Sequence, residues 1–287
     1  MSTHEAFFLL IVLFVGCFFG FVEAVPIKVL VSLQSEVEFV QAVGQDRVEV
    51  MPVIPAGSFH EYYEPSARLM QFLSSASLYI KNGYLPFEIK QIPVFKKMNK
   101  RLKIVDGNAL MKWQRYEPVD ASDEVMPVDP HVWLSPKTVV DQVTIICDEL
   151  SRLDPDFKPF YQMNRDVYIQ KLKRLDSQIA RLLQKTTHKH FLTMHPSFGY
   201  FCQAYGLTQI SVEEADKALT PQHYKELVDG VRSLRIPVLV VERSSASDMS
   251  KKLARSLGVR TIVMDTASTN YVSSMVSFAL KLSQALR

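Results

Sequence analysis

One stretch in the middle of the chain limits the fold more than any other. Residues 158–185 contain no glycine, and their only proline, Pro159, stands at the start. Apolar side chains recur every three or four positions in this stretch, as Tyr168, Leu172, Leu175, Ile179 and Leu182. The spacing predicts one amphipathic helix of about 28 residues, ~40 Å long. A helix of that length suits a rigid connection between two lobes and predicts small movements between them.

Short β-type runs alternate with helical patterns on both sides of this helix. The runs lie at 27–33, 48–54, 77–80, 103–105, 191–194, 209–212, 237–241 and 261–264. Helices are predicted from Pro136 to about Leu153, from Pro221 onward, and over Asp248–Leu257. The alternation favours parallel sheets. We therefore predict an α/β fold with two lobes, 25–157 and 187–287, each a parallel sheet flanked by helices and joined by a linking helix at 158–186.

The N-terminus has a different character. Residues 6–22 carry no charge and are rich in Phe, Leu and Val. This stretch is short for a membrane span and suits the core of a signal peptide, so we assign 1–24 to a signal that directs the chain to the periplasm. A lipid anchor at Cys17 and a retained membrane anchor are the alternatives. In the mature chain we expect Cys147 and Cys202 to be buried free thiols.

Composition narrows the functional classes. The 287 residues are 47% apolar and 22% charged, as in ordinary folded proteins. A net charge of +3 gives no reason to expect a nucleic-acid partner. The sequence has no Gly-rich phosphate loop and no Gly-x-Ser-x-Gly motif, which argues against nucleotide binding of those types and against the common serine hydrolases.

The most informative motif is Asp-Pro-His-Val-Trp-Leu-Ser-Pro-Lys at residues 129–137. His131 stands on a loop stiffened by proline. Ser135 and Pro136 follow as the expected N-cap and first residue of a helix. An imidazole at a junction between strand and helix lies where open α/β folds bind ligands.

Four candidate metal ligands follow β-type runs. They are His60, His131, His195 and Asp265, two from each lobe. We expect a helix opened by Pro196 directly after His195. The carboxyl ends of parallel strands share one edge of a sheet, so three imidazoles and one carboxylate converge if both edges face a common cleft. Imidazole nitrogen and carboxylate oxygen are suitable ligands for Zn²⁺.

The chain resembles the cluster A-I solute-binding proteins of bacterial ABC importers, of the zinc or manganese type. The resemblance spans most of the mature chain and is most specific at residues 129–137 and 195–201. Other matching segments are 55–57, 63–66, 79–83 and 205–207. The resemblance implies the paired-lobe fold with a metal site in the interlobe cleft. By matched position, it also implies His131, His195 and Asp265 as ligands.

The first ligand departs from the family pattern. Members of the family carry a His two residues before the Tyr of Tyr-Glu-Pro, but Glu61 occupies that position here and His60 stands one residue earlier. Either the loop shifts so that His60 binds, or Glu61 binds in its place or beside it.

The resemblance also bears on the metal and the partner. In the family, a His at the third ligand position goes more often with zinc and a Glu with manganese. Nitrogen-rich sites favour the late first-row metals as well. We therefore expect a monomeric binding protein, not an enzyme, that captures Zn²⁺, or alternatively Mn²⁺ or Fe²⁺, and delivers it to an ABC permease in the cytoplasmic membrane.

Two other functions stay open. One is a zinc hydrolase with Glu61 as general base, although the His-Glu-x-x-His signature is absent. The other is an adhesion protein that keeps the fold. Glu242 ends the run at 237–241 and is expected to be a solvated strand end, whereas Trp133 and Phe198 are expected to pack in the core.

Overall fold

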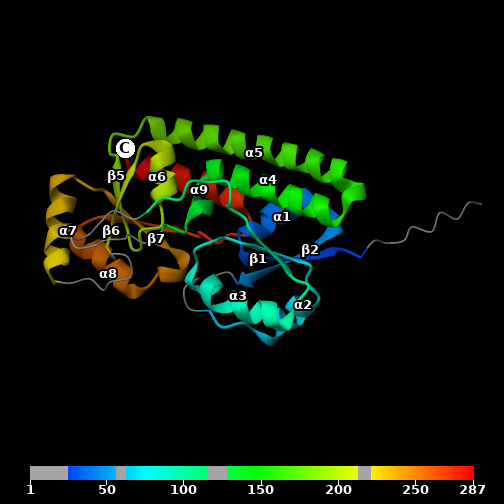
Figure 1. Ribbon diagram of the computed structural model, residues 1–287. Helices are drawn as coiled ribbons and strands as arrows, with labels where there is room; N and C mark the ends of the chain where they lie inside the picture. The colour runs from blue at the N-terminus through cyan, green and yellow to red at the C-terminus, as the bar shows by residue number, and fades with distance from the viewer. Residues whose placement is uncertain (1–24, 56–62, 116–127, 213–220) are drawn as a thin grey trace, which may run out of the picture.

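The computed structural model describes residues 25–55, 63–115, 128–212 and 221–287 (Figure 1). These residues form two four-stranded sheets in which all strand pairs are parallel, as predicted. The first sheet has the order β2 (Val48–Ile54), β1 (Ile27–Leu33), β3 (Leu78–Lys81), β4 (Lys103–Asp106). The second has the order β6 (Thr208–Ser211), β5 (His190–Thr193), β7 (Val238–Glu242), β8 (Arg260–Met264).

The two sheets share one topology, and this fixes where ligands are expected. In each sheet the chain moves outward from the first strand in one direction and then reverses. The reversals lie between β1 and β3 and between β5 and β7. The carboxyl ends of strands beside such a reversal form the usual ligand-binding crevice of open α/β sheets.

Helices connect the strands. The first lobe, which precedes the long helix, contains α1 (Glu36–Gly44), α2 (Ala67–Ser75), α3 (Pro86–Met98) and α4 (Pro136–Leu153). The second lobe contains α6 (Gly199–Tyr205), α7 (Pro221–Ser233), α8 (Asp248–Leu257) and α9 (Tyr271–Ala285). The ranges of α4 and α8 agree with the predicted ones, and each strand of the second sheet lies within one residue of its predicted bounds.

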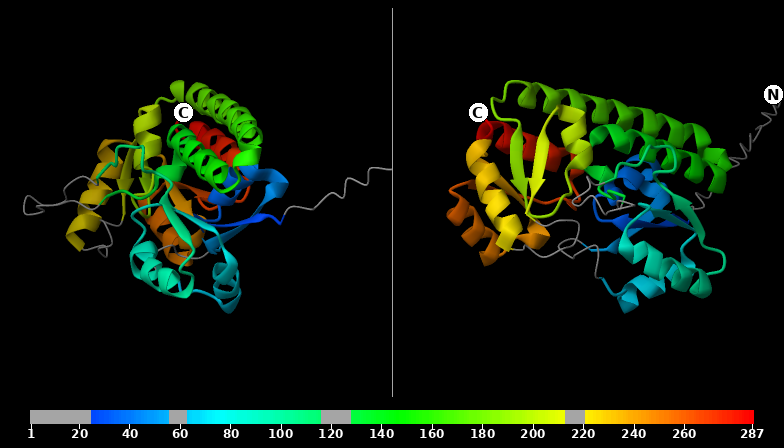
Figure 2. Two further views of the ribbon diagram at one scale, coloured as in Figure 1. Left: turned by 45° about the vertical axis from the view of Figure 1, so that its right-hand side comes forward. Right: turned by 60° about the vertical axis from the view of Figure 1, so that its left-hand side comes forward.

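The predicted long helix is α5 (Lys158–Gln184), with 27 residues. Its buried side chains recur at helical spacing: Tyr161, Tyr168, Leu172, Leu175, Ile179 and Leu183. This face packs against α1 and α4 of the first lobe and against α6 and α9 of the second. Figures 1 and 2 show α5 lying along one side of the molecule, over both sheets. The helix therefore connects the lobes by packing on both of them.

One hydrophobic core extends through both lobes. It includes Leu30 and Tyr79 of the first sheet, Leu172 of α5, and Phe191 and Val240 of the second sheet. A smaller cluster includes Leu192, Leu239 and Val241 of the second sheet, Leu227 and Val231 of α7 and Ala254 of α8. The contents of the larger cluster show that the lobes are not separately packed bodies.

The cysteines agree with the sequence expectation, since Cys147 and Cys202 are both buried and free. Among the helices that the structure describes, none is long and apolar enough to cross a membrane. The expected signal segment, residues 1–24 with Cys17, lies outside the described residues.

Candidate metal centre

His131 is held at the end of a well-bonded loop. The residue precedes a single 3₁₀ turn at Val132–Leu134, after which α4 begins at Pro136. Its side chain is 1% exposed. The loop before it is anchored on the first lobe, because Nδ2 of Asn82 donates to the carbonyl oxygen of Pro130 at 2.8 Å. The imidazole therefore has a fixed backbone beneath it.

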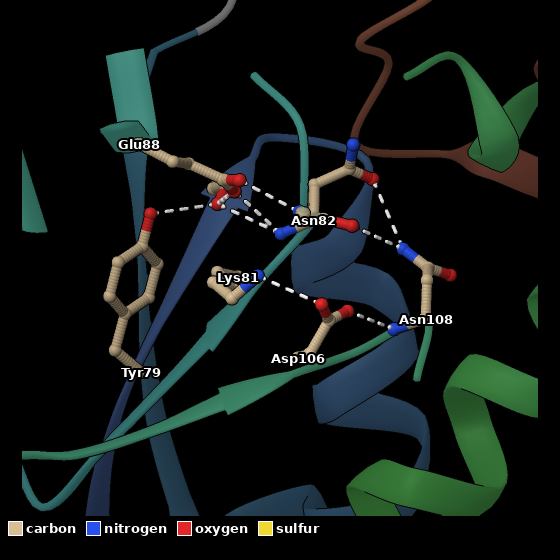
Figure 3. Close-up of polar contacts among 8 residues, drawn as sticks. Tyr79, Lys81, Asn82, Glu88, Asp106 and Asn108 are labelled. Atoms are coloured by element: carbon tan, nitrogen blue, oxygen red, sulfur yellow. Dashed lines mark hydrogen bonds and ion pairs between the residues drawn. The ribbon is translucent and has the colours of Figure 1, made fainter. Parts of the chain in front are cut away.

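A buried polar network holds Asn82 in turn (Figure 3). The carboxylate of Glu88, at the start of α3, accepts the backbone N–H groups of Asn82 at 2.6 Å and Gly83 at 2.7 Å. Nδ2 of Asn108 donates to the carbonyl oxygen of Asn82 at 2.7 Å. Burial raises the pKa of Glu88. The network lies at the carboxyl end of β3, beside the strand-order reversal of the first sheet, and supports the loop of His131.

Asp129 orients the imidazole of His131. Its Oδ1 lies 2.7 Å from Nδ1 of the ring and also accepts the backbone N–H of His131 at 2.9 Å. Burial and the neighbouring His195 lower the pKa of His131 to about 3, so the ring is neutral near pH 7. Burial also raises the pKa of Asp129 to about 7, and a cation bound to the ring would favour the ionised carboxylate. A neutral imidazole that donates Nδ1–H to a carboxylate presents Nε2 as a metal ligand.

Two residues of the second lobe contact Asp129. The hydroxyl of Tyr200 in α6 donates to the carbonyl oxygen of Asp129 at 3.1 Å. Gly199, the first residue of α6, lies so close to Asp129 that a Cβ atom there would overlap Oδ2 of the carboxylate. The carboxylate that orients His131 is thus packed directly against the other lobe.

His195 follows β5 and faces His131. The ring centroids of the two imidazoles are 5.1 Å apart, with 67° between the ring planes. The predicted helix opened by Pro196 is wrong in its start, because α6 begins at Gly199. The intervening residues form a turn, in which Ser197 donates its N–H to the carbonyl oxygen of His195 at 2.8 Å. The backbone N–H of Phe198 donates a hydrogen bond to Oε1 of Gln209 at 2.8 Å.

Asp265 follows β8 and has other partners in this conformation. Its Oδ2 lies 3.2 Å from Nε of Arg243, and its Oδ1 accepts the N–H of Ala267 at 3.3 Å. It lines a polar cavity of about 410 Å³ together with Arg243 and serines of α9. Within the described ranges, no three His, Cys, Asp or Glu side chains are grouped closely enough to hold a metal ion. The structure therefore brings His131 and His195 together but does not add Asp265 to them.

The remaining predicted ligands, His60 and Glu61, lie outside the described residues. Three other side chains of the site were not assigned a role from the sequence. Asp129 orients His131. The sequence feature that could have identified it is its position two residues before that His. Trp133 is buried as expected, and its Nε1 also donates to the carbonyl oxygen of Thr266 at 2.9 Å. The prediction that Glu242 is a solvated strand end was wrong. Its side chain is 5% exposed, because Glu242 ends a central strand.

Comparison with known proteins identifies the family to which the chain belongs. The sequence matches the family described as "ZnuA: Zinc-uptake complex component A periplasmic" over residues 29–285. The chain belongs to this family. The resemblance to the zinc or manganese type of cluster A-I solute-binding proteins is thereby confirmed.

The similar proteins agree in name and fold. The zinc-binding lipoprotein AdcA of Streptococcus pneumoniae serotype 4 is 28% identical over 268 residues, which cover 87% of this chain and 54% of AdcA. The chain thus spans about half the length of that relative. The high-affinity zinc uptake system protein ZnuA of Bacillus subtilis is 26% identical over 251 residues, 84% of this chain and 78% of the relative. The match to a crystal structure of ZnuA has 27% sequence identity and a TM-score of 0.84. It covers 91% of this chain and 100% of the ZnuA chain.

Proposed function

We propose that this protein binds Zn²⁺ outside the cytoplasmic membrane and delivers the ion to an ABC permease. The observation that carries the proposal is the pair of imidazoles, His131 and His195, which approach to 5.1 Å between ring centroids at the boundary of the two lobes. His131 is buried, neutral and oriented by Asp129, as a metal ligand requires. Membership of a family described as a zinc-uptake component supports the same role.

The proposed ligand set is His60, His131, His195 and Asp265, with Glu61 in place of or beside His60. The set combines neutral nitrogen donors with one carboxylate, which suits Zn²⁺ in a tetrahedral site. Asp265 reaches such a site only after its carboxylate exchanges Arg243 for the metal ion. Metal capture is therefore proposed to include a local rearrangement after β8.

The nature of this donor set also supports the choice of metal. Three imidazoles favour Zn²⁺ over Mn²⁺, which prefers oxygen donors. Mn²⁺ and Fe²⁺ remain the alternatives, because geometry and metal supply also govern occupancy. In a competition among the three ions at one pH, we expect Zn²⁺ to be retained. Repeating the competition with His60→Ala tests the first ligand, because a shift toward Mn²⁺ is expected if Glu61 then takes its place.

Export, partner and domain division are proposed from the sequence and the family. Residues 1–24 are proposed to direct the chain to the periplasm, where a monomer would meet the permease. The division into lobes at 25–157 and 187–287, with 158–186 as the linking helix, stays a prediction. The hydrolase alternative has lost support, because the family consists of solute-binding proteins rather than enzymes.

Metal analysis after equilibrium dialysis tests the proposal. The parent protein is expected to hold one Zn²⁺ per chain, and a His131→Ala/His195→Ala double variant is expected to lose it. His188→Ala is the matched control, because His188 lies before β5 and outside the imidazole pair. Full retention of zinc by the double variant would rule out these ligands. Turnover of ester, peptide or phosphate substrates by the zinc-loaded protein would instead favour the hydrolase.

A further inference from the structure

Glu242 occupies a central position at the edge of the second sheet. It is the last residue of β7, which pairs with β5 on one side and β8 on the other. Thr193 lies opposite Val240, so continuing this register by two residues places His195 level with Glu242. On the other side Glu242 lies opposite Met264, one residue before Asp265. Glu242 therefore stands between the two proposed ligands of this lobe, beside the strand-order reversal where ligands bind.

The carboxylate of Glu242 is buried and bonded to the segment that carries Asp265. It is 5% exposed, and its Oε2 accepts the hydroxyl of Thr266 at 2.8 Å. The carbonyl oxygen of the same Thr266 accepts the indole N–H of Trp133, from the His131 segment, at 2.9 Å. Thr266 is thus held from both lobes, by a carboxylate on one side and an indole on the other.

Glu242 lies close enough to His131 for its charge to act on that imidazole. A negative charge near the ring also stabilises a metal cation bound to the ring.

The charge of the ion gives Glu242 a role in this arrangement. A divalent ion held mainly by neutral imidazoles brings two positive charges into a buried site, and carboxylates such as the ligand Asp265 and the neighbouring Asp129 offset them. Such a charge is costly unless a counter-charge lies nearby, because the protein interior screens charge weakly. Glu242 is a further buried carboxylate, on the side of His195, that adds to this counter-charge.

We propose that Glu242 is a positioning residue of the metal site, which holds Thr266 beside Asp265 and offsets the charge of the bound divalent cation without ligating it. The inference rests on the proposed function. The competing explanation is that the carboxylate only fastens the end of β7 to Thr266, with no effect on the metal.

Two variants separate these roles. Glu242→Gln keeps an oxygen that accepts the Thr266 hydroxyl and removes the charge. Thr266→Val keeps the charge and removes the hydroxyl. Glu226→Gln, at an exposed position of α7, is the control for the change in net charge. Zinc affinity is measured on the full chain against a chromophoric chelator, and the stability of the metal-free proteins by thermal unfolding.

We expect Glu242→Gln to weaken zinc binding by about 10- to 100-fold, with Tm of the metal-free protein unchanged or raised. Thr266→Val is expected to weaken binding less, and Glu226→Gln not at all. X-ray absorption is expected to show the same number of ligand atoms coordinated to zinc in the parent and in Glu242→Gln. A ligand atom lost from the zinc in the variant would make Glu242 a direct ligand and overturn the proposal.

The other outcomes are equally distinct. Equal affinity in the parent and Glu242→Gln overturns the role of Glu242 and leaves the proposed function standing. A loss of affinity matched by a loss of metal-free stability in both variants assigns Glu242 a structural role only. A parent protein that binds no zinc overturns the proposed function, and this inference with it.

Discussion

Trp133 donates its indole N–H to the carbonyl oxygen of Thr266 at 2.9 Å, and this bond joins the two segments that carry His131 and Asp265. The indole ring also lies 5.3 Å from the imidazole of His131, between ring centroids. Two proposed ligands from different lobes are therefore linked by one side chain. Their separation is set by this contact as well as by the long helix.

Replacing Trp133 by Phe tests that link. The variant keeps an aromatic ring in the core and leaves the carbonyl oxygen of Thr266 without its donor. We expect zinc affinity to fall about 3- to 10-fold, which corresponds to the roughly 0.5–1.5 kcal/mol of one hydrogen bond. Trp113→Phe is the matched control, because Trp113 packs against Tyr84 in the first lobe. Isothermal titration of both variants gives the comparison, and equal affinities would contradict the link.

Gly199 is expected to tolerate no side chain. The methyl group of Gly199→Ala would overlap Oδ2 of Asp129 and displace the carboxylate that orients His131. We expect zinc binding to weaken at least tenfold, as for other losses of a carboxylate behind a metal-bound His. Gly230→Ala is the control, because a Cβ atom there meets no other atom within 4 Å. Gly230 lies inside α7, so the control is expected to gain up to ~1 kcal/mol of stability.

The ion pair between Arg243 and Asp265 predicts a variant with higher affinity. Nε of Arg243 lies 3.2 Å from Oδ2 of Asp265, so the guanidinium competes with an incoming metal for the same carboxylate. Arg243→Ala is expected to bind zinc severalfold more tightly and to capture it faster. Arg232→Ala, exposed on α7, controls for the lost positive charge. Weaker binding in Arg243→Ala would instead mean that Arg243 holds Asp265 in place for the metal.

Glu36 predicts a pH dependence of the stability of the metal-free protein. The side chain is buried and accepts hydrogen bonds from the N–H of Leu33 at 2.9 Å and from Nε2 of Gln142 at 3.0 Å. Burial raises its pKa to about 8 from 4.5. A folded-state pKa above the unfolded one contributes stability that is complete below pH 4.5 and is lost as the pH rises through 8.

The free energy of unfolding of metal-free protein is therefore expected to fall between pH 5 and pH 8 relative to Glu36→Gln, by on the order of 1–3 kcal/mol. The variant keeps the buried shape and cannot ionise. Chemical denaturation at the two pH values measures the difference, with Glu49→Gln at an exposed position of β2 as control. A parent protein that gains stability over this range relative to Glu36→Gln would contradict the prediction.

The fold was predictable where a pattern was long and regular. The 27 residues of α5 bury one face at helical spacing over many turns, and few other structures satisfy that pattern. α3 was not predicted, because Pro93 interrupts it and two of its apolar residues, Ile89 and Val94, are exposed at 70% and 42%. Such a helix is held by packing of Phe87 and Phe95 rather than by its own pattern.

The site was predictable at the level of ligand types but not of their partners. Strand ends and the 129–137 motif were sufficient to select His131 and His195, which the structure brings together. The roles of Asp129, Thr266 and Glu242 depend on which strands lie next to each other and on side chains from the opposite lobe. A single sequence does not report such pairings, so a buried Glu242 was indistinguishable from a solvated one.

Because the two lobes share one core, bound metal is expected to be detectable from thermal unfolding. Because one hydrophobic cluster joins residues of both sheets with α5, neither half can melt without exposing surface that the other half uses. Heating is then expected to produce a single cooperative transition. An ion bound at the boundary raises the temperature of that whole transition, by linkage between binding and folding. The unfolding temperature would thus report how much of the protein carries metal. A spectroscopic probe in either lobe would give the same temperature.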